Sequence, residues 1–207
     1  MAQYIEINED HPQPHRLEKV TDALRNGELI AYPTDSVYAI GCDIMNQKAI
    51  DKLCLLKGIK PGKAQFSFIF ESLSQVADYS KQIDNQLFKL LKKTLPGPYT
   101  YIINANNKLP KLLQTKKKTM GVRIPNNEIT RSLVKTLGNP IITTSIKDED
   151  DIQEYFTDPW LIYEKFENQL AFVIDGGLGN IEASTVVDCT DGINVVREGL
   201  GDIYQYI

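Results

Sequence analysis

Apolar and polar positions along the chain repeat with two periods, one typical of helices and one typical of strands. Apolar residues three and four positions apart predict amphipathic helices over residues 17–24, 50–57, 87–95, 129–137 and 160–166. Short apolar or alternating runs predict strands over residues 4–7, 29–32, 66–70, 99–103, 120–124, 141–145, 172–174, 185–188 and 194–197. Helices and strands alternate early and strands cluster late, which predicts an α/β fold with a mixed sheet flanked by helices.

Glycine, proline and asparagine mark the expected ends of several helices. Asn26-Gly27 follows the first helix, because glycine can take the left-handed conformation of a C-terminal cap. Gly138 ends the helix over 129–137 in the same way, and Asn126 or Asn127 begins it. The chain has no internal repeat, low-complexity tract or change of composition that would mark a linker, so a single domain over 1–207 is expected.

The composition favours a folded, soluble protein. Apolar residues make up 42% and charged residues 24%, which excludes general disorder. The net charge of -4 argues against a protein that mainly coats nucleic-acid phosphates. Cys42, Cys54 and Cys189 lack metal-clip or redox-motif spacing, so buried thiols in a reducing compartment are expected. No basic leader followed by an apolar run is present, and no apolar run approaches the ~20 residues of a membrane span, so a cytoplasmic location is expected.

The loop that follows the strand over 29–32 collects hydroxyl groups. The loop offers Thr34, Asp35, Ser36 and Tyr38. Its hydroxyls are candidates to hold a small polar ligand, and Gly41 would allow a close approach. Taken alone, these residues are equally compatible with a turn that is capped by an aspartate or a serine. The residues by themselves leave both interpretations open.

Polar residues also stand at the ends of later strands. Arg123 follows apolar residues and fits either an anion clamp or a surface arginine with a buried stem. Thr143 and Ser145 end the next strand and fit either a phosphate-binding loop or an ordinary turn. The pattern is repeated near the C-terminus by Ser184, Thr185 and Arg197.

Several other motifs favour simple structural interpretations. His11 and His15 have the spacing of a metal pair, but prolines beside them deny a helix, so a surface loop is expected. No other histidine is present, which excludes Ser–His and Cys–His catalysis, and there is no P-loop motif. The glycine-rich residues 176–179 predict a hairpin between two strands. The acidic run 148–151 and the lysine run 116–118 predict solvated segments, with Mg²⁺ binding and a basic pocket edge as the respective alternatives.

Taken in order, six segments resemble the YrdC/YciO family of threonylcarbamoyl-AMP synthases. They are YPTDSVYAIGCD (32–43), LPGPYT (95–100), GVRIP (121–125), PIITTS (140–145), STVVD (184–188) and VREG (196–199). The segments KKKTMGVR (116–123) and REGLGD (197–202) are most similar to the YciO branch. The resemblance implies a twisted mixed sheet flanked by helices, with a concave ligand-binding face and without the extra C-terminal domain of longer members.

The same resemblance implies a reaction. Family synthases condense L-threonine, bicarbonate and ATP into threonylcarbamoyl-AMP and pyrophosphate, the first step toward a modified adenosine in tRNA. A carbamate oxygen attacks the α-phosphorus, which needs positioning and positive charge but no protein nucleophile. The implied partners are therefore ATP, L-threonine or threonylcarbamoyl-AMP, with Mg²⁺ accompanying ATP.

The resemblance also implies roles for particular residues. Lys57 and Arg123 are the candidate catalytic residues. The candidate substrate- and nucleotide-binding residues are Thr34, Ser36, Tyr38, Lys60, Thr143, Ser145, Ser184, Thr185 and Arg197. Among them, the Thr34 loop would hold the threonine part, and Ser184 and Thr185 would lie near the threonylcarbamoyl group.

Two departures from the synthase pattern limit these implications. Synthases have Lys-x-Arg at the end of the second helix, whereas this chain has KGIK over 57–60 with Ile59 in the arginine position. Lys60 replaces that arginine only through a one-residue shift and as a point charge. A Ser-x-Asn segment of the synthases is Ser145-Ile-Lys147 here. Loss of a phosphate-binding arginine removes ~2–4 kcal/mol of transition-state stabilisation from a site that works by electrostatics.

Two hypotheses of different classes follow. The first is a nucleotide-binding enzyme that forms or hydrolyses threonylcarbamoyl-AMP, or a protein that only binds it. The second is a module that binds double-stranded RNA or tRNA through local basic residues. Those residues are Lys57, Lys60, Lys63, Arg123 and the lysine run 116–118.

Overall fold

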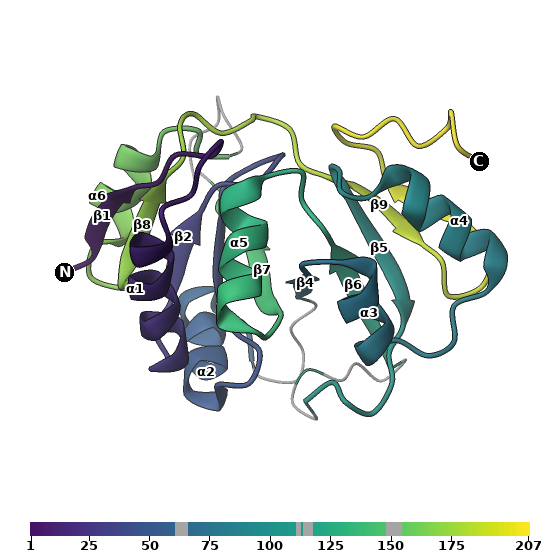
Figure 1. Ribbon diagram of the computed structural model, residues 1–207, viewed down its shortest axis with the longest axis horizontal. Helices are drawn as coiled ribbons and strands as arrows, with labels where there is room; N and C mark the ends of the chain where they lie inside the picture. Colours follow the sequence, from purple (N-terminus) through teal and green to yellow (C-terminus); the bar gives the residue numbers. More distant parts are fainter. Residues whose placement is uncertain (61–65, 111–112, 114–117, 148–154) are drawn as a thin grey trace.

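The computed structural model describes residues 1–60, 66–110, 113, 118–147 and 155–207 (Figure 1). Its helices are α1 (Pro14–Arg25), α2 (Gln47–Leu56), α3 (Leu73–Tyr79), α4 (Asn85–Thr94), α5 (Glu128–Leu137) and α6 (Pro159–Phe166). Its strands are β1 (Gln3–Glu6), β2 (Ile30–Tyr32), β3 (Ala39–Asp43), β4 (Ser67–Ile69), β5 (Tyr99–Asn104), β6 (Thr119–Arg123), β7 (Ile141–Ser145), β8 (Phe172–Asp175), β9 (Thr185–Asp188) and β10 (Asn194–Arg197).

The described strands form one mixed sheet in the order β1-β8-β2-β3-β7-β4-β6-β5-β9-β10. β8 pairs in parallel with β1 and β2, while β3 and β7 run antiparallel to their neighbours. β4 is parallel to β6 and β5 is parallel to β9, but β5 and β6 are antiparallel to each other. The predicted α/β fold with a mixed sheet is confirmed.

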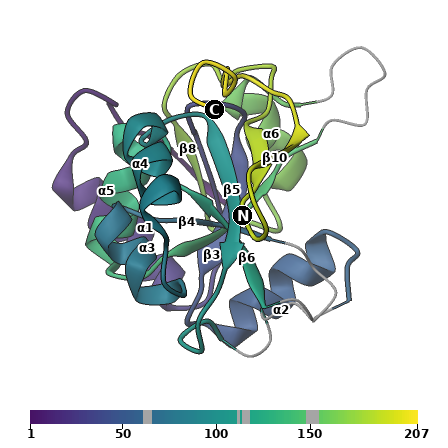
Figure 2. The ribbon, with the colours of Figure 1, turned by 90° about the vertical axis from the view of Figure 1, so that its right-hand side faces the viewer.

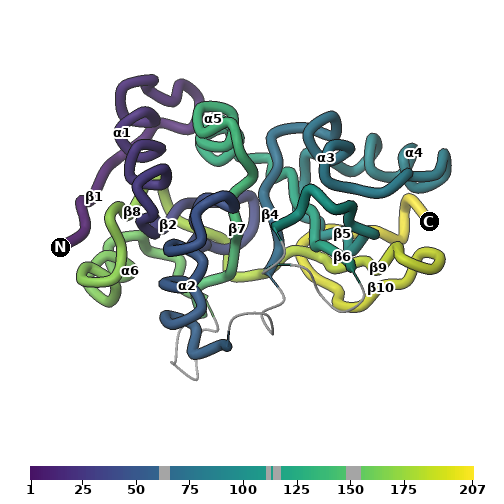
Figure 3. The backbone as a smooth tube through the Cα atoms, turned by 90° about the horizontal axis from the view of Figure 1, so that it is seen from below, coloured from purple at the N-terminus to yellow at the C-terminus, as the bar shows by residue number. Residues whose placement is uncertain are grey.

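Two apolar clusters hold the helices against the sheet. Residues alternate between them along β2, since Ile30 and Tyr32 belong to the smaller cluster and Ala31 to the larger one. The smaller cluster packs α1 and α5 on one face of the sheet, and Figure 3 shows α2 on the opposite side. The larger cluster lies beneath α2 and α6 and continues under α3 and α4, which lie beside β5 in Figures 1 and 2. The loops at the ends of β2, β6 and β7 are therefore held by buried elements.

The predicted caps of α5 and α1 are confirmed. The side chain of Asn127 accepts a hydrogen bond from the Thr130 N–H at 3.0 Å, which decides between the two candidate asparagines. Gly138 ends α5 with φ 83°, and Gly27 follows α1 with φ 82°. None of the helices in the described ranges has the length and apolar character needed to cross a membrane.

Three sequence predictions need correction. The glycine-rich residues 176–179 do not form a hairpin, because β8 lies between β1 and β2 while β9 lies between β5 and β10. The chain crosses the sheet between these strands instead. His15 lies in α1 although a surface loop was predicted, because Pro14 is tolerated in the first turn of a helix. Finally, β3 and α3 were not predicted from the hydrophobic pattern.

Candidate functional site

The loop between β2 and β3 is folded by its own hydroxyl groups. The Thr34 hydroxyl donates to the Val37 carbonyl at 2.8 Å and accepts from the Ser36 N–H at 3.1 Å. The Thr34 and Ser36 hydroxyls lie 3.2 Å apart, and both side chains are buried. This arrangement is a turn stabilised by a threonine side chain, so the turn and the ligand interpretations of the sequence are not exclusive.

Arg123, at the end of β6, points into this loop. Its Nη2 donates to Ser36 Oγ at 2.9 Å and lies 3.1 Å from Asp35 Oδ1 and 3.5 Å from Thr34 Oγ1. The other carboxylate oxygen of Asp35 accepts the Asn126 N–H at 2.8 Å. Asp35 thus links the loop before β3 to β6 through a buried ion pair and to the loop before α5 through the Asn126 N–H.

A cavity of about 350 Å³ lies beside these groups. It is open to solvent and is lined by Thr34, Asp35, Ser36 and residues 178–181. Leu178 and Ile181 on its rim are 81% and 69% exposed, whereas its inner wall is polar. The cavity therefore offers hydroxyl and carboxylate groups on one side and exposed aliphatic side chains on the other.

Tyr38 holds the segment that follows β8 against the loop between β2 and β3. Its hydroxyl donates to the Gly177 carbonyl at 2.7 Å and accepts from the Gly176 N–H at 3.2 Å. The side chain is fully buried, and burial raises the pKa of its phenol. The structure thus gives Tyr38 a role in placing residues 178–181, and its predicted contact with substrate stays a prediction.

Thr143 and Ser145 of β7 lie opposite Gly41 and Ala39 of β3. The hydroxyls of Thr143 and Tyr32 are both buried and have no hydrogen-bond partner in the described part of the chain. Burial, the larger effect, raises the pKa of the Tyr32 phenol, and the Thr143 side chain lowers it. The two hydroxyls therefore do not form a hydrogen bond of normal geometry with each other.

Lys57 reaches the end of β7 from the C-terminal end of α2. Its Nζ lies 3.4 Å from the Ser145 carbonyl oxygen. Burial, followed by the nearby charge of Lys147, lowers the pKa of the Lys57 amine. Ile59 is partly buried and Lys60 is exposed, so the predicted compensation by Lys60 stays untested.

Ser184, Thr185 and Arg197 form a separate group at β9 and β10. The Ser184 and Thr100 hydroxyls lie 2.8 Å apart, and Arg197 Nη2 donates to the Ser184 carbonyl at 2.7 Å. The Thr185 hydroxyl donates to the Gly201 carbonyl at 2.6 Å and accepts from the Gly199 N–H at 3.0 Å. The structure thus brings Thr34, Ser36 and Arg123 together, and it brings Lys57 to Ser145. The hydrogen bonds of Ser184, Thr185 and Arg197 described above are made within the separate group.

Other candidate motifs give little support for a metal or redox site. Among the described residues, no three His, Cys, Asp or Glu side chains form a group that could hold a metal ion. His11 and His15 are exposed, and the three cysteines are free thiols, of which Cys189 is partly exposed. Lys63, the acidic run 148–151, Lys116 and Lys117 lie outside the described residues.

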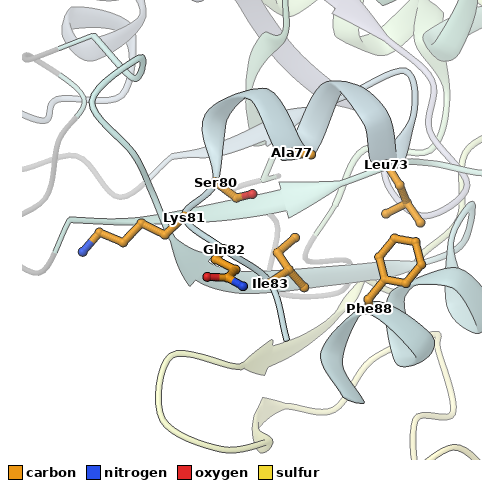
Figure 4. A pocket seen from close by; sticks show the side chains of 7 residues that line it. All are labelled: Leu73, Ala77, Ser80, Lys81, Gln82, Ile83 and Phe88. Atoms are coloured by element: carbon orange, nitrogen blue, oxygen red, sulfur yellow. The ribbon is translucent and has the colours of Figure 1, made fainter. Parts of the chain in front are cut away.

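Sequence reasoning named Asp35 among the polar residues of its loop but not among the site residues, and it did not place residues 178–181 in the site. Asp35 stands between two predicted site residues, so its position was the available signal. Residues 176–179 were predicted to form a hairpin, and the local sequence does not show that the chain crosses the sheet there. A second cavity of about 270 Å³, shown in Figure 4, is lined by Leu73, Ala77, Ser80, Lys81, Gln82, Ile83 and Phe88. It contains none of the predicted site residues.

Comparisons with known proteins agree with the six ordered motifs. The family model for Sua5, YciO and YrdC proteins, described as "Telomere recombination", matches residues 22–199. YciO of Escherichia coli strain K12 is 36% identical over the full length of both chains, and the crystal structure of E. coli YciO matches with a TM-score of 0.91 and full coverage of both chains.

Two further relatives extend the comparison. A threonylcarbamoyl-AMP synthase of Photobacterium profundum is 29% identical over 88% of this chain and 98% of its own. P. abyssi Sua5, solved in complex with L-threonine, is 24% identical, with a TM-score of 0.84 over 96% of this chain and 58% of that chain, and it supports the fold. The chain belongs to the Sua5/YciO/YrdC family.

Proposed function

We propose that this protein binds threonylcarbamoyl-AMP or ATP in the cavity beside Thr34, Asp35 and Ser36, and that it forms or hydrolyses the adenylate. The observation that supports this proposal best is the polar wall of the cavity, where the Thr34 and Ser36 hydroxyls lie beside the buried Asp35–Arg123 ion pair. Hydroxyl groups beside a guanidinium that Asp35 holds in place suit a polar ligand. The similarity to the threonylcarbamoyl-AMP synthase of P. profundum supports the choice of this ligand class.

The proposed chemistry depends on positioning and charge. In the synthetic direction, an oxygen of the threonine carbamate forms a bond to the α-phosphorus of ATP, and pyrophosphate leaves. In the hydrolytic direction, water replaces the carbamate at the adenylate and AMP is released. Lys57 and Arg123 would stabilise the charge that develops on the phosphate, and Thr143 and Ser145 would line the nucleotide. Mg²⁺ would enter as part of the ATP complex, that is, as substrate.

Ile59 bears on how fast the protein is expected to synthesise the adenylate. The guanidinium found at this place in synthases is missing, and Lys60, the nearest cation in sequence, is exposed. We expect slow synthesis at most, because one phosphate contact contributes ~2–4 kcal/mol to the transition state. An assay with radiolabelled ATP, threonine and bicarbonate beside an Ile59→Arg variant tests this. Unchanged adenylate formation in Ile59→Arg would contradict the role given to residue 59.

Binding is tested separately from turnover. Calorimetric titration of the wild-type protein with threonylcarbamoyl-AMP and with ATP should show saturable binding. Arg123→Met should weaken that binding, while Arg197→Met tests the separate group at β10. An absence of heat at millimolar concentrations of both ligands would overturn the proposed function.

Binding of double-stranded RNA or tRNA is the second candidate. Of the lysines it invokes, Lys57 is half-buried and directs its amine at the Ser145 carbonyl, which leaves Lys60 as an exposed lysine beside it. Binding of this kind should weaken steeply as salt is added, because counterions are released from the phosphates. The test is a gel shift at micromolar protein. A shift that disappears between about 50 and 200 mM salt, as expected for several phosphate contacts, would support RNA binding. The absence of a shift at low salt would remove this candidate.

A further inference from the structure

The ion pair between Asp35 and Arg123 is almost enclosed by protein. Each side chain is 8% exposed, and Asp35 Oδ1 lies 3.1 Å from Arg123 Nη2. Solvent therefore screens this pair less than it screens the surface pairs, such as Lys108–Asp78, whose side chains are 63% and 60% exposed. Arg123 enters the site with its charge already paired.

The contacts of Arg123 are concentrated on one nitrogen. Nη2 meets Asp35, Ser36 and Thr34, whereas Nε is buried and has no hydrogen-bond partner in the described part of the chain. The guanidinium can turn about its long stem unless the contacts of Nη2 hold it. Among those contacts, Asp35 supplies the charge, and the two hydroxyls supply neutral acceptors.

Asp35 is itself fixed at both oxygens. Its second oxygen accepts the Asn126 N–H at 2.8 Å, just before the cap of α5. The Thr130 hydroxyl of α5 donates to the Pro33 carbonyl at 2.5 Å, two residues before Asp35. The Asp35 carboxylate is thus fixed by the loop before α5, and the loop that carries Asp35 is fixed by α5 itself. This makes the carboxylate a rigid support for the guanidinium.

We infer that Asp35 is a positioning residue, whose carboxylate sets the direction of the Arg123 guanidinium and of the Ser36 hydroxyl at the cavity wall. The inference deepens the proposed function and rests on it for the binding part alone. It differs from a purely structural role, because loss of the carboxylate should change the orientation of Arg123 in a protein that remains folded.

Nitrogen-15 NMR of the protein without ligand tests the orientation. The Nε–H signal of Arg123, assigned by its absence from Arg123→Lys, should be resolved and slow to exchange in the wild type, because this atom is buried. In Asp35→Asn, which keeps the shape and removes the charge, the signal should shift and exchange faster. Asp43→Asn is the matched control: Asp43 is buried and accepts the Met45 N–H at 2.9 Å, and Arg123 is not among its hydrogen-bond partners.

Titration with threonylcarbamoyl-AMP tests the consequence. Asp35→Asn should bind at least about tenfold more weakly than the wild type, equivalent to ~1.4 kcal/mol, whereas Asp43→Asn should bind like the wild type. Asp35→Glu keeps the charge on a longer stem and should recover part of the affinity. Thermal unfolding of each variant checks that the protein is folded.

The outcomes separate the inference from the proposed function. An unchanged Arg123 signal together with unchanged affinity in Asp35→Asn overturns the positioning role. If Asp35→Asn does not fold, Asp35→Glu decides: a displaced Arg123 signal with weaker binding supports the role, and wild-type values overturn it. If the wild type binds neither threonylcarbamoyl-AMP nor ATP, the proposed function fails, while the NMR measurement still decides whether Asp35 orients Arg123.

Discussion

Lys57 is a half-buried amine at the end of α2, and its pKa is lowered by burial and by Lys147. A phosphate group beside this amine should raise its pKa again, because an opposite charge favours the protonated form. Binding of ATP at a pH just below the ordinary lysine value of ~10.4 should therefore be accompanied by proton uptake. Calorimetry in two buffers that differ in ionisation enthalpy measures the uptake. It should be lost in Lys57→Met and kept in Lys60→Met, and equal uptake in both variants would contradict the assignment.

Gly41 lets β3 approach its neighbours closely. A Cβ at this position would lie 2.4 Å from the Ile142 carbonyl oxygen and 2.9 Å from the Tyr32 ring. Gly41→Ala should lower the free energy of unfolding by ~3 kcal/mol, the upper range for overpacking against atoms that cannot move aside. Gly58→Ala is the comparison, because its Cβ would meet open space and only its φ of 62° is unfavourable, which costs ~1–2 kcal/mol. Urea unfolding measures both; a smaller loss at Gly41 would show that β3 and β7 can separate.

At the scale of elements, the N-terminus of α5 connects stability to the site. Asn127 caps the helix, and the neighbouring Asn126 N–H binds Asp35. Asn127→Ala should lower the free energy of unfolding by ~1 kcal/mol and should also weaken the binding of threonylcarbamoyl-AMP. Asn46→Ala removes the equivalent cap of α2, where the side chain accepts from the Ala49 N–H. It should cost at least as much stability, because the Asn46 amide also donates to the Arg25 carbonyl at 3.1 Å. It should leave binding unchanged, so equal binding losses would remove the proposed connection.

The elements themselves could be predicted from sequence more completely than their arrangement. The caps at Asn127 and Gly138 have a local chemical cause, and the predicted helices and strands that rest on strong periodicity are present. β3 was missed because all five of its residues are buried, which leaves no alternation of polar and apolar positions. The segment that crosses the sheet after β8 was predicted to be a hairpin, because the residues of a strand do not show which other strand it pairs with. The pairing of Asp35 with Arg123 was missed for the same reason, since the two residues lie 88 positions apart in the chain.

At the scale of the whole molecule, buried phenols and thiols make stability depend on alkaline pH. Burial raises the pKa of Tyr32, Tyr38, Tyr101 and Cys42, and raises that of Cys189 to about 12. These groups ionise near pH ~8.5–10 in the unfolded chain and stay protonated in the folded one. The unfolded state therefore binds fewer protons in this range, and the free energy of unfolding should fall as pH rises from 8 to 10.5. The lowered pKa of Lys57 acts in the opposite direction, but it is one group against several.

Two buried tyrosines allow the pH-dependent loss of stability to be separated from the contribution of a hydrogen bond. Tyr32 and Tyr101 are both fully buried in strands, but the Tyr101 hydroxyl lies 2.7 Å from Thr94 Oγ1 whereas the Tyr32 hydroxyl has no partner within the described residues. At pH 7, Tyr101→Phe should lose ~1 kcal/mol of stability, while Tyr32→Phe should be at least as stable as the wild type, because an unpaired buried hydroxyl is removed.

Toward pH 10.5 both variants should lose less stability than the wild type, by up to ~1.4 kcal/mol for each pH unit. Urea unfolding across this range measures all three proteins. A marked loss in Tyr32→Phe at pH 7 would mean that its hydroxyl bonds to Thr143 in solution, and a slope equal to that of the wild type would mean that Tyr32 ionises within the folded protein.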